Sequence, residues 1–231
     1  ANVHFEDNNM LVLEKTSFNY GEGKVTFSAR LDIRDSLLTP FEFELFTENL
    51  NLNKLLPPLD FFNIKLLANL EKLPEDLNLI IKHRGIIDDH KGLVPNSSTG
   101  EVYFDIKDGD LLAGKITYQP DATAIKDSIN NKAFTKAKIL LEGDPSIFNN
   151  FFQTEQFFFS KGRFFFNFDY SDSHATKRHI LDNSTAHLKI ANSSVHYKPT
   201  GVDFPLTKID LFLKSGEADF DLFVRSDSLD R

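Results

Sequence analysis

The sequence predicts a mainly β protein, built as an elongated, curved antiparallel sheet or groove with two or three short helices. Three observations predict this fold class. Apolar and polar residues alternate along several stretches, phenylalanine is the dominant aromatic residue, and one strand-like stretch recurs later in the chain. Alternation with period two is typical of strands that have one dry and one wet face. Such strands can also close into a β-sandwich, which is the alternative.

The two copies of the recurring stretch are residues 11–46 and residues 188–223. They align without a gap. The matches fall mostly on alternating positions, which point to one face of a sheet. They include Leu11/Leu188, Tyr20/Tyr197, Val25/Val202, Phe27/Phe204, Phe43/Phe220, Leu45/Leu222 and Phe46/Phe223. We interpret residues 1–231 as a single elongated β region with this internal repeat. Two unrelated strands with compatible alternation are the alternative explanation.

The first elements predict a hairpin and a third strand. Residues 24–33 alternate without a break, and Gly21-Glu22-Gly23 gives a tight-turn signal after a strand that ends at Tyr20. A further strand follows at 41–45. Residues 49–56 then predict a short helix that ends before Pro57-Pro58, and residues 59–73 predict an extended strand.

The middle of the chain predicts a second hairpin. Residues 77–82 predict a strand, and a connection follows from His83 to Thr99. Strands at 102–107 and 111–118 should pair through a turn at Asp108-Gly109. Between 121 and 136, apolar residues recur at near-helical spacing and predict a helix.

The last third begins with a helix signal. Asp144 is a good N-cap, and Pro145 would occupy the first helical position of a short helix. Two Phe triplets, at 157–159 and 164–166, flank residues 160–163 and predict a hairpin around Gly162. A mostly polar connection at 171–183 precedes the second copy of the repeat.

Composition excludes several classes of function. The net charge is −8, from 26 basic and 34 acidic residues, and neither sign forms a long block, which argues against a nucleic-acid partner. The absence of Cys excludes disulfides, zinc–thiolate sites and thiol nucleophiles. No segment approaches the ~20 apolar residues that span a bilayer, and no signal peptide opens the chain.

Two groups of histidines are candidate metal ligands. One combines His83 with the run Asp88-Asp89-His90, and the other combines His174 and His179 with a nearby aspartate. Both groups lie in polar connections, where solvation explains them, so we predict no metal site.

No catalytic motif is present. Carboxylate pairs such as Glu42/Glu44 and Asp219/Asp221 occupy the polar side of strands, where a solvated face explains them. A nucleophile elbow, a phosphate loop and a dinucleotide fingerprint are all missing from the sequence. We predict a protein that is not an enzyme, with no catalytic residue and no cofactor.

The alternating apolar residues carry the sharper hypothesis. With 24 Phe and no Trp, the strands should share an extensive apolar face. That face either packs as a closed two-layer core or lines an open trough for acyl chains. The candidate lipid-binding residues are Val25, Phe27, Leu31, Phe43, Leu45, Phe164, Phe166, Phe168, Phe204, Leu206, Phe220 and Leu222.

Three stretches resemble the AsmA-like family of Gram-negative bacteria. They are residues 186–197, residues 201–206 with 220–222, and the Gly-led stretch 162–170. The run Leu50-x-Leu52-x-x-Leu55-Leu56 is similar to a short leucine segment of that family. The resemblance covers about two thirds of the chain and lies in hydrophobic spacing and in Gly, Tyr and Phe positions.

The resemblance implies a function. Proteins of this family face the periplasm, are usually held by an inner-membrane helix, and have elongated β-grooves implicated in moving phospholipid toward the outer membrane. We therefore expect a periplasmic groove segment that binds or passes phospholipid for outer-membrane assembly, anchored to the inner membrane through a region outside this sequence. The alternative is a structural or adhesion module with a closed Phe-rich core. The sequence does not specify the oligomeric state.

Overall fold

The computed structural model describes most of the chain as one antiparallel sheet of 13 strands. The residues that it describes are 2–7, 9–34, 37–51, 77–90, 92–94, 97–106, 111–120, 135–151, 156–171, 183–214 and 216–225. Within them the mainly β, elongated fold class is confirmed, with one short helical segment where two or three short helices are predicted. All strands of the described residues lie in one open sheet, so these strands do not form the closed sandwich.

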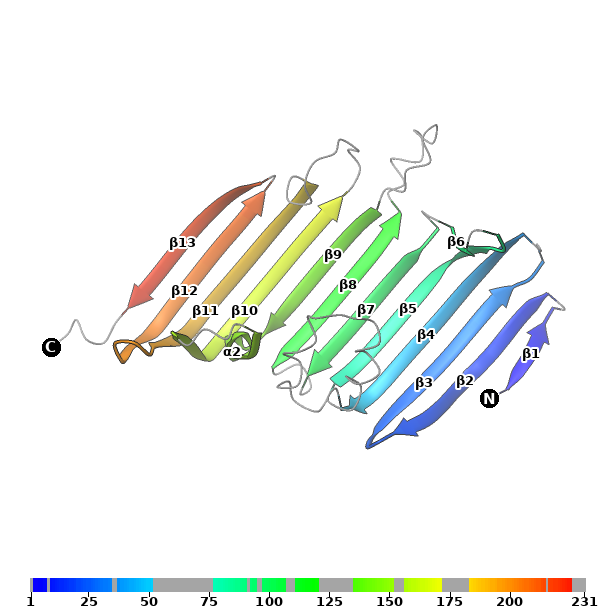
Figure 1. Ribbon diagram of the computed structural model, residues 1–231, viewed down its shortest axis with the longest axis horizontal. Helices are drawn as coiled ribbons and strands as arrows, with labels where there is room; N and C mark the ends of the chain where they lie inside the picture. Colours follow the sequence, from blue (N-terminus) through cyan, green and yellow to red (C-terminus); the bar gives the residue numbers. More distant parts are fainter. Residues whose placement is uncertain are drawn as a thin grey trace.

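The strands follow one another across the sheet in chain order (Figure 1). Each pairs antiparallel with the next, except that β5 pairs with β7 and the two-residue β6 pairs only with β5. The first strand, β1, and the last strand, β13, therefore lie at opposite ends of the sheet. The strands are β1 Val3–Glu6, β2 Met10–Tyr20, β3 Gly23–Asp32, β4 Leu38–Leu50, β5 Leu77–Asp88, β6 Gly92–Leu93, β7 Thr99–Ile106, β8 Leu112–Pro120, β9 Thr135–Gly143, β10 Phe157–Ser171, β11 Ser184–Tyr197, β12 Val202–Lys214 and β13 Glu217–Arg225.

The register gives the sheet two different faces. Directly paired residues point to the same side, so each cross-strand row belongs to one face. One side, the apolar face, contains the row Phe18, Val25, Thr47, Leu79, Phe104, Gly114, Leu141, Phe166, Leu188, Leu211 and Phe220. The other side, the charged face, contains the row Ser28, Glu44, Lys82, Glu101, Thr117, Lys138, Asp169, Thr185, Lys214 and Glu217.

A short helical segment covers one end of the apolar face. The 3-10 turn η3 (Pro145–Ile147) leads into α2 (Phe148–Phe151), and Asp144 caps it by accepting a hydrogen bond from the Ser146 backbone N–H at 2.7 Å. Ile147 is 1% exposed and joins the only cluster of buried hydrophobic residues in the described part of the chain. Its other buried members, all on the apolar face, are Ile106, Leu112, Phe164 and Ile190. The helix predicted after Asp144 is confirmed.

The hairpin predicted around Gly162 is wrong, because β10 runs unbroken from Phe157 to Ser171. Both Phe triplets pair with the same neighbour, β11, across a bulge. Gly162 has φ +141°, and a Cβ there would lie 2.8 Å from the Cα of Ser193. The glycine therefore serves a close approach to the bulge of β11, where Asn192 has φ +53°, and not a turn.

Other boundaries differ from the sequence prediction. The connection predicted from His83 is in part strand, since β5 continues to Asp88. The hairpins β2–β3 and β7–β8 are confirmed as antiparallel pairs, with Gly21 at φ +62° in the first turn. Of the helix predicted at 49–56, residues 49 and 50 belong to β4, and of that at 121–136, residues 135 and 136 belong to β9. The remainder of both helices, apart from residue 51, and the strand predicted at 59–73 lie outside the described residues.

The two proposed repeat copies have the same strand order but different turns. Strands β2–β3–β4 and β11–β12–β13 are both antiparallel meanders. Leu11 pairs with Leu31, whereas its counterpart Leu188 pairs with Leu211, which is three residues beyond the gapless alignment. The repeat stays a prediction, and its copies do not share one register.

Candidate functional site

The apolar face brings together residues from both halves of the chain. Of the twelve predicted residues, the register places ten in rows of this face: Val25, Phe27, Leu31, Phe43, Leu45, Phe164, Phe166, Phe168, Phe220 and Leu222. Phe204 pairs with Val195, and Val195 pairs with Phe159. The ring of Phe159 contacts Phe148 of the covering helix. Phe204 therefore also lies on the apolar face.

Leu206 is the exception. The pairing between β11 and β12 shifts between Phe204 and Thr207, so Phe204 and Leu206 no longer share a face. Leu206 falls instead in the alternating set of Lys208 and Asp210, on the charged face. Simple alternation in the sequence predicted the wrong side for Leu206 because it cannot show a bulge.

The exposed fractions of the predicted side chains show whether the apolar face is a packed core or an open surface. Of the twelve predicted residues, only Phe164 is buried, at 3% exposed. Phe220 and Leu222 are 61% and 51% exposed, and the other nine are half-buried. Side chains in a closed two-layer core are mostly buried. Among the described residues the apolar face is therefore an open surface, covered at one end by η3 and α2.

The apolar face carries one polar pair that sequence reasoning missed. His83 of β5 and Tyr118 of β8 belong to the row Ala29, Phe43, His83, Gly100, Tyr118, Ala137, Tyr170 and Ser184. The Nδ1 atom of His83 and the Tyr118 hydroxyl form a hydrogen bond that crosses above Gly100 of β7. A Cβ on Gly100 would overlap the Tyr118 ring, so glycine is required for this contact.

The pair sits in aromatic surroundings. The ring centroid of His83 lies 5.2 Å from that of Phe41 and 5.4 Å from that of Phe43. Burial lowers the pKa of His83 below its ordinary value and raises the pKa of Tyr118. Both shifts favour the uncharged forms. The pair is therefore a neutral hydrogen-bonding group within an otherwise apolar surface.

A signal for this pair was present in the sequence. His83 continues the alternation of Leu77, Leu79 and Ile81, which places it on the same face as those residues. The prediction ends the strand at Lys82, six residues before the end of β5, and assigns His83 to a polar connection. Tyr118 was within a predicted strand, but the sequence does not show that Gly100 lies between the two side chains.

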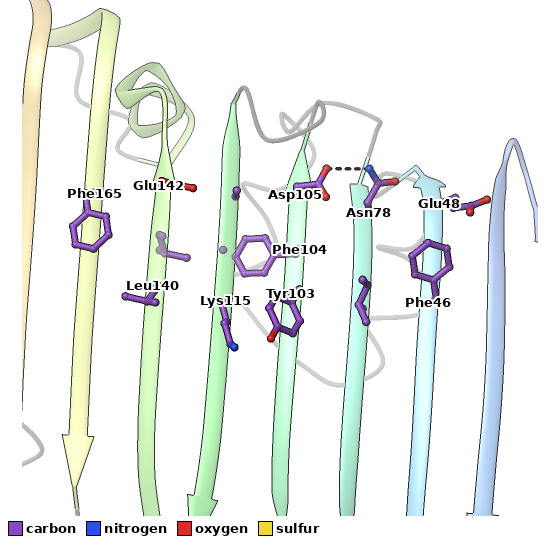
Figure 2. Close-up of a pocket in the computed structure, with 14 residues that line it drawn as sticks. Phe46, Glu48, Asn78, Tyr103, Phe104, Asp105, Lys115, Leu140, Glu142 and Phe165 are labelled. Carbon is purple, nitrogen blue, oxygen red and sulfur yellow. Dashed lines mark hydrogen bonds between the residues drawn. The ribbon is translucent and has the colours of Figure 1, made fainter.

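The charged face has a shallow depression of about 710 Å³ (Figure 2). Its floor is mostly apolar, from Phe46, Tyr103, Leu140 and Phe165 among others, and it lies over the small residue Ala113. Figure 2 shows acidic side chains, among them Asp105, gathered toward one end of these strands. The depression can accommodate an apolar group with polar atoms facing this acidic rim.

Hydrogen bonds organise the polar residues in and beside the depression. Asn78 donates to Asp105 at 2.9 Å, and the Tyr103 hydroxyl donates to Glu101 at 2.7 Å. The second bond lowers the pKa of Glu101. The Lys115 ammonium lies 4.6 Å from the centre of the Tyr103 ring and 3.7 Å from Glu101 Oε1, so this cation already has partners.

The carboxylates considered for catalysis lie on the charged face. Glu44 forms an ion pair with Lys82 at 3.2 Å, and Asp221 is exposed on β13 opposite Asp210. Within the described ranges, no group of three His, Asp or Glu side chains is placed to hold a metal ion. The candidates His174 and His179 lie outside those ranges.

Comparisons with protein-family models, with curated proteins and with solved structures found no match. In the part of the chain that the structure describes, no helix is long and apolar enough to cross a membrane. Geometry and chemistry of the two faces are thus the basis for a functional proposal.

Proposed function

We propose that the apolar face binds the acyl chains of phospholipid. The observation that carries this proposal is an apolar sheet face that spans the strands from β2 to β13 and has no second sheet over it among the described residues. Large exposed apolar surfaces in soluble proteins mark sites for a ligand, a partner or a membrane. Each CH₂ group moved from water onto such a surface contributes ~0.8 kcal/mol when fully buried, so acyl chains are well-matched ligands.

The mechanism of this binding is passive. Cross-strand rows of Leu, Ile and Phe continue from strand to strand, as in the row from Phe18 to Phe220. A chain on such a uniform surface can move along it with little change in contact area, and its polar head group can stay in water. No step of the process needs a catalytic residue.

The cellular role extends this proposal and rests on the resemblance to AsmA-like proteins. We propose that the sheet is a section of a periplasmic groove that binds or passes phospholipid for outer-membrane assembly. The alternative is a structural or adhesion module with a closed Phe-rich core. The open sheet among the described residues supports the lipid-binding proposal over this alternative.

A pair of adjacent substitutions tests the acyl-chain site. Phe166 points to the apolar face and Phe165, its neighbour on β10, to the charged face. The variant Phe166→Glu should lose most of the phospholipid that copurifies with the protein, because a carboxylate on the apolar face must give up hydration. The matched variant Phe165→Glu should retain it, since Phe165 is 42% exposed on the other side. Native mass spectrometry and lipid extraction measure the phospholipid that copurifies with each variant.

Two results would contradict the proposal. If the wild-type protein stays free of lipid after incubation with phosphatidylethanolamine vesicles, the apolar face is not an acyl-chain site. If lipid is lost from Phe165→Glu and kept by folded Phe166→Glu, the lipid lies in the depression of the charged face. Circular dichroism establishes that both variants are folded.

A further inference from the structure

We propose that His83 and Tyr118 form a polar subsite that binds the ester carbonyl oxygen of a phospholipid whose acyl chain lies on the apolar face. This inference rests on the proposed function and specifies how the lipid is oriented. It starts from the position of the pair, which forms a hydrogen bond on the apolar face above Gly100.

The pair always retains one free donor. Neutral histidine has one N–H and tyrosine has one O–H, and the bond between Nδ1 of His83 and the Tyr118 hydroxyl uses only one of these hydrogens. If the tyrosine donates, the His83 Nε2–H remains. If the histidine donates, the Tyr118 O–H remains. Among the described residues neither side chain has a second hydrogen bond.

The surroundings favour an uncharged acceptor. The rings of Phe41 and Phe43 flank His83, and Gly100 lies under the Tyr118 ring. None of these neighbours carries a charge, and the pKa of His83 is lowered by burial alone. A free carboxylate at this position would be poorly compensated, whereas an ester carbonyl needs only a neutral donor. The pair therefore suits an esterified acyl chain better than an ionised fatty acid.

The length of the face fits one acyl chain. Tyr118 and Leu112 are six residues apart on β8, which corresponds to ~20 Å along an extended strand. Leu112 belongs to the buried cluster beneath Ile147, so the face is covered at that end. One leaflet of the ~30 Å hydrocarbon core of a bilayer is ~15 Å deep. A chain whose carbonyl binds at His83–Tyr118 can thus extend along the strands toward the covered end.

Two glycines make room for the side chains that form and surround the subsite. Gly100 leaves the space in which the His83–Tyr118 bond forms, and Gly85 lies next to His83 in the apolar-face set of β5. A Cβ at Gly85 would lie 3.1 Å from the Phe41 ring and 3.2 Å from the Ser98 hydroxyl oxygen. The Ser98 hydroxyl is buried and has no hydrogen-bond partner in the described part of the chain. It supplies a further unused polar atom at this end of the face.

An ester-to-ether comparison tests the subsite. The two probes are phosphatidylethanolamines of equal chain length, one with diacyl ester chains and one with dialkyl ether chains that have no carbonyl. Wild-type protein should bind the ester lipid about fivefold more tightly, the effect of one neutral hydrogen bond. The double variant His83→Phe/Tyr118→Phe should bind both lipids equally. The ratio is measured on one protein sample, so it does not depend on the folded fraction.

A control and a spectroscopic readout complete the test. Tyr103→Phe removes a tyrosine hydroxyl from the charged face and should keep the ester preference. Infrared spectra of a lipid labelled with ¹³C at the ester carbonyl should show a hydrogen-bonded band with wild-type protein and not with the double variant.

The outcomes separate the two proposals. Equal binding of ester and ether lipids by the wild type, or an ester preference that survives in the double variant, would overturn the subsite and leave the acyl-chain surface in place. Binding of neither lipid by the wild type would overturn the proposed function and the subsite together.

Discussion

At the scale of single residues, neighbours across the sheet set the chemistry of a side chain more than neighbours in the sequence do. His83 stands between Lys82 and Arg84 in the chain, yet its ring packs on Phe41 and Phe43. Strand alternation sends the two flanking cations to the other face. The imidazole is therefore half-buried in aromatic surroundings that disfavour its charged form.

The lowered pKa of His83 predicts a pH dependence of stability. Below about pH 6.5 the unfolded chain binds a proton at this position more readily than the folded protein does. The stabilising contribution is therefore present above about pH 6.5 and is lost as the pH falls. Between about pH 7 and about pH 5, His83→Phe should lose less unfolding free energy than the wild type, as measured by urea denaturation. A His90→Gln control should retain the wild-type profile, and identical profiles for all three proteins would contradict the assignment.

The sequence predicts residues well where strands are regular. Ten of the twelve residues expected on one apolar face lie in its rows, because alternation alone decides the side in a regular strand. The prediction puts Leu206 on the wrong face, because a bulge shifts the strand pairing next to this residue. The subsite at His83 required knowledge of the register between β5, β7 and β8, which pairs residues far apart in the chain and has no signature in either strand alone.

At the scale of elements, the short segment η3–α2 closes one end of the apolar face. Its signal in the sequence was local, since Asp144 and Pro145 are adjacent and act on the first turn. The hairpin expected around Gly162 was also inferred from a local signal, but the deciding contact there is with Ser193 of another strand. Glycine favours tight turns and close backbone approaches alike, so its position in sequence does not distinguish them.

Truncation of the central side chain of this segment should destabilise the protein. Ile147 is 1% exposed and packs on Phe164 and the other members of the cluster. The variant Ile147→Ala should lower the free energy of unfolding by about 2–4 kcal/mol, because it leaves a cavity at a place where no other described segment covers the strands. Urea denaturation measures the change. Ile33→Ala removes a side chain that is 43% exposed and should change stability by less than about 0.5 kcal/mol. Equal effects would show that the segment does not contribute a core.

At the scale of the whole molecule, the sheet is a single layer whose two outer strands are each paired on one side among the described residues. The most exposed large apolar side chains gather there, with Val3 and Phe5 on β1 and Phe220 on β13 at 59–61% exposure. Unpaired strand edges with apolar side chains are templates for pairing with another chain.

The exposed edge at β13 predicts that copies of the protein associate at high protein concentration. The double variant Phe220→Lys/Leu222→Lys on β13 should reduce it, since lysines on an outer strand oppose edge pairing. Sedimentation velocity over a concentration series measures the effect. Phe212→Lys changes an exposed apolar residue on β12, which is paired on both sides, and should leave association unchanged. Association that is equal in all three proteins would exclude the edge of β13 as its cause.

The pairing of each strand with its neighbours in chain order also determines how the sheet unfolds. Apart from the pair β5–β7, every hydrogen-bonded pair joins consecutive strands. Stability is then close to a sum of nearest-neighbour terms, as in solenoid proteins, and opening can start at either outer strand and proceed inward. Amide hydrogens should accordingly exchange fastest in β1 and β13 and slowest beside the buried cluster in β8 to β11. Cooperativity in this molecule is a property of a linear series of strands, and not of one common core.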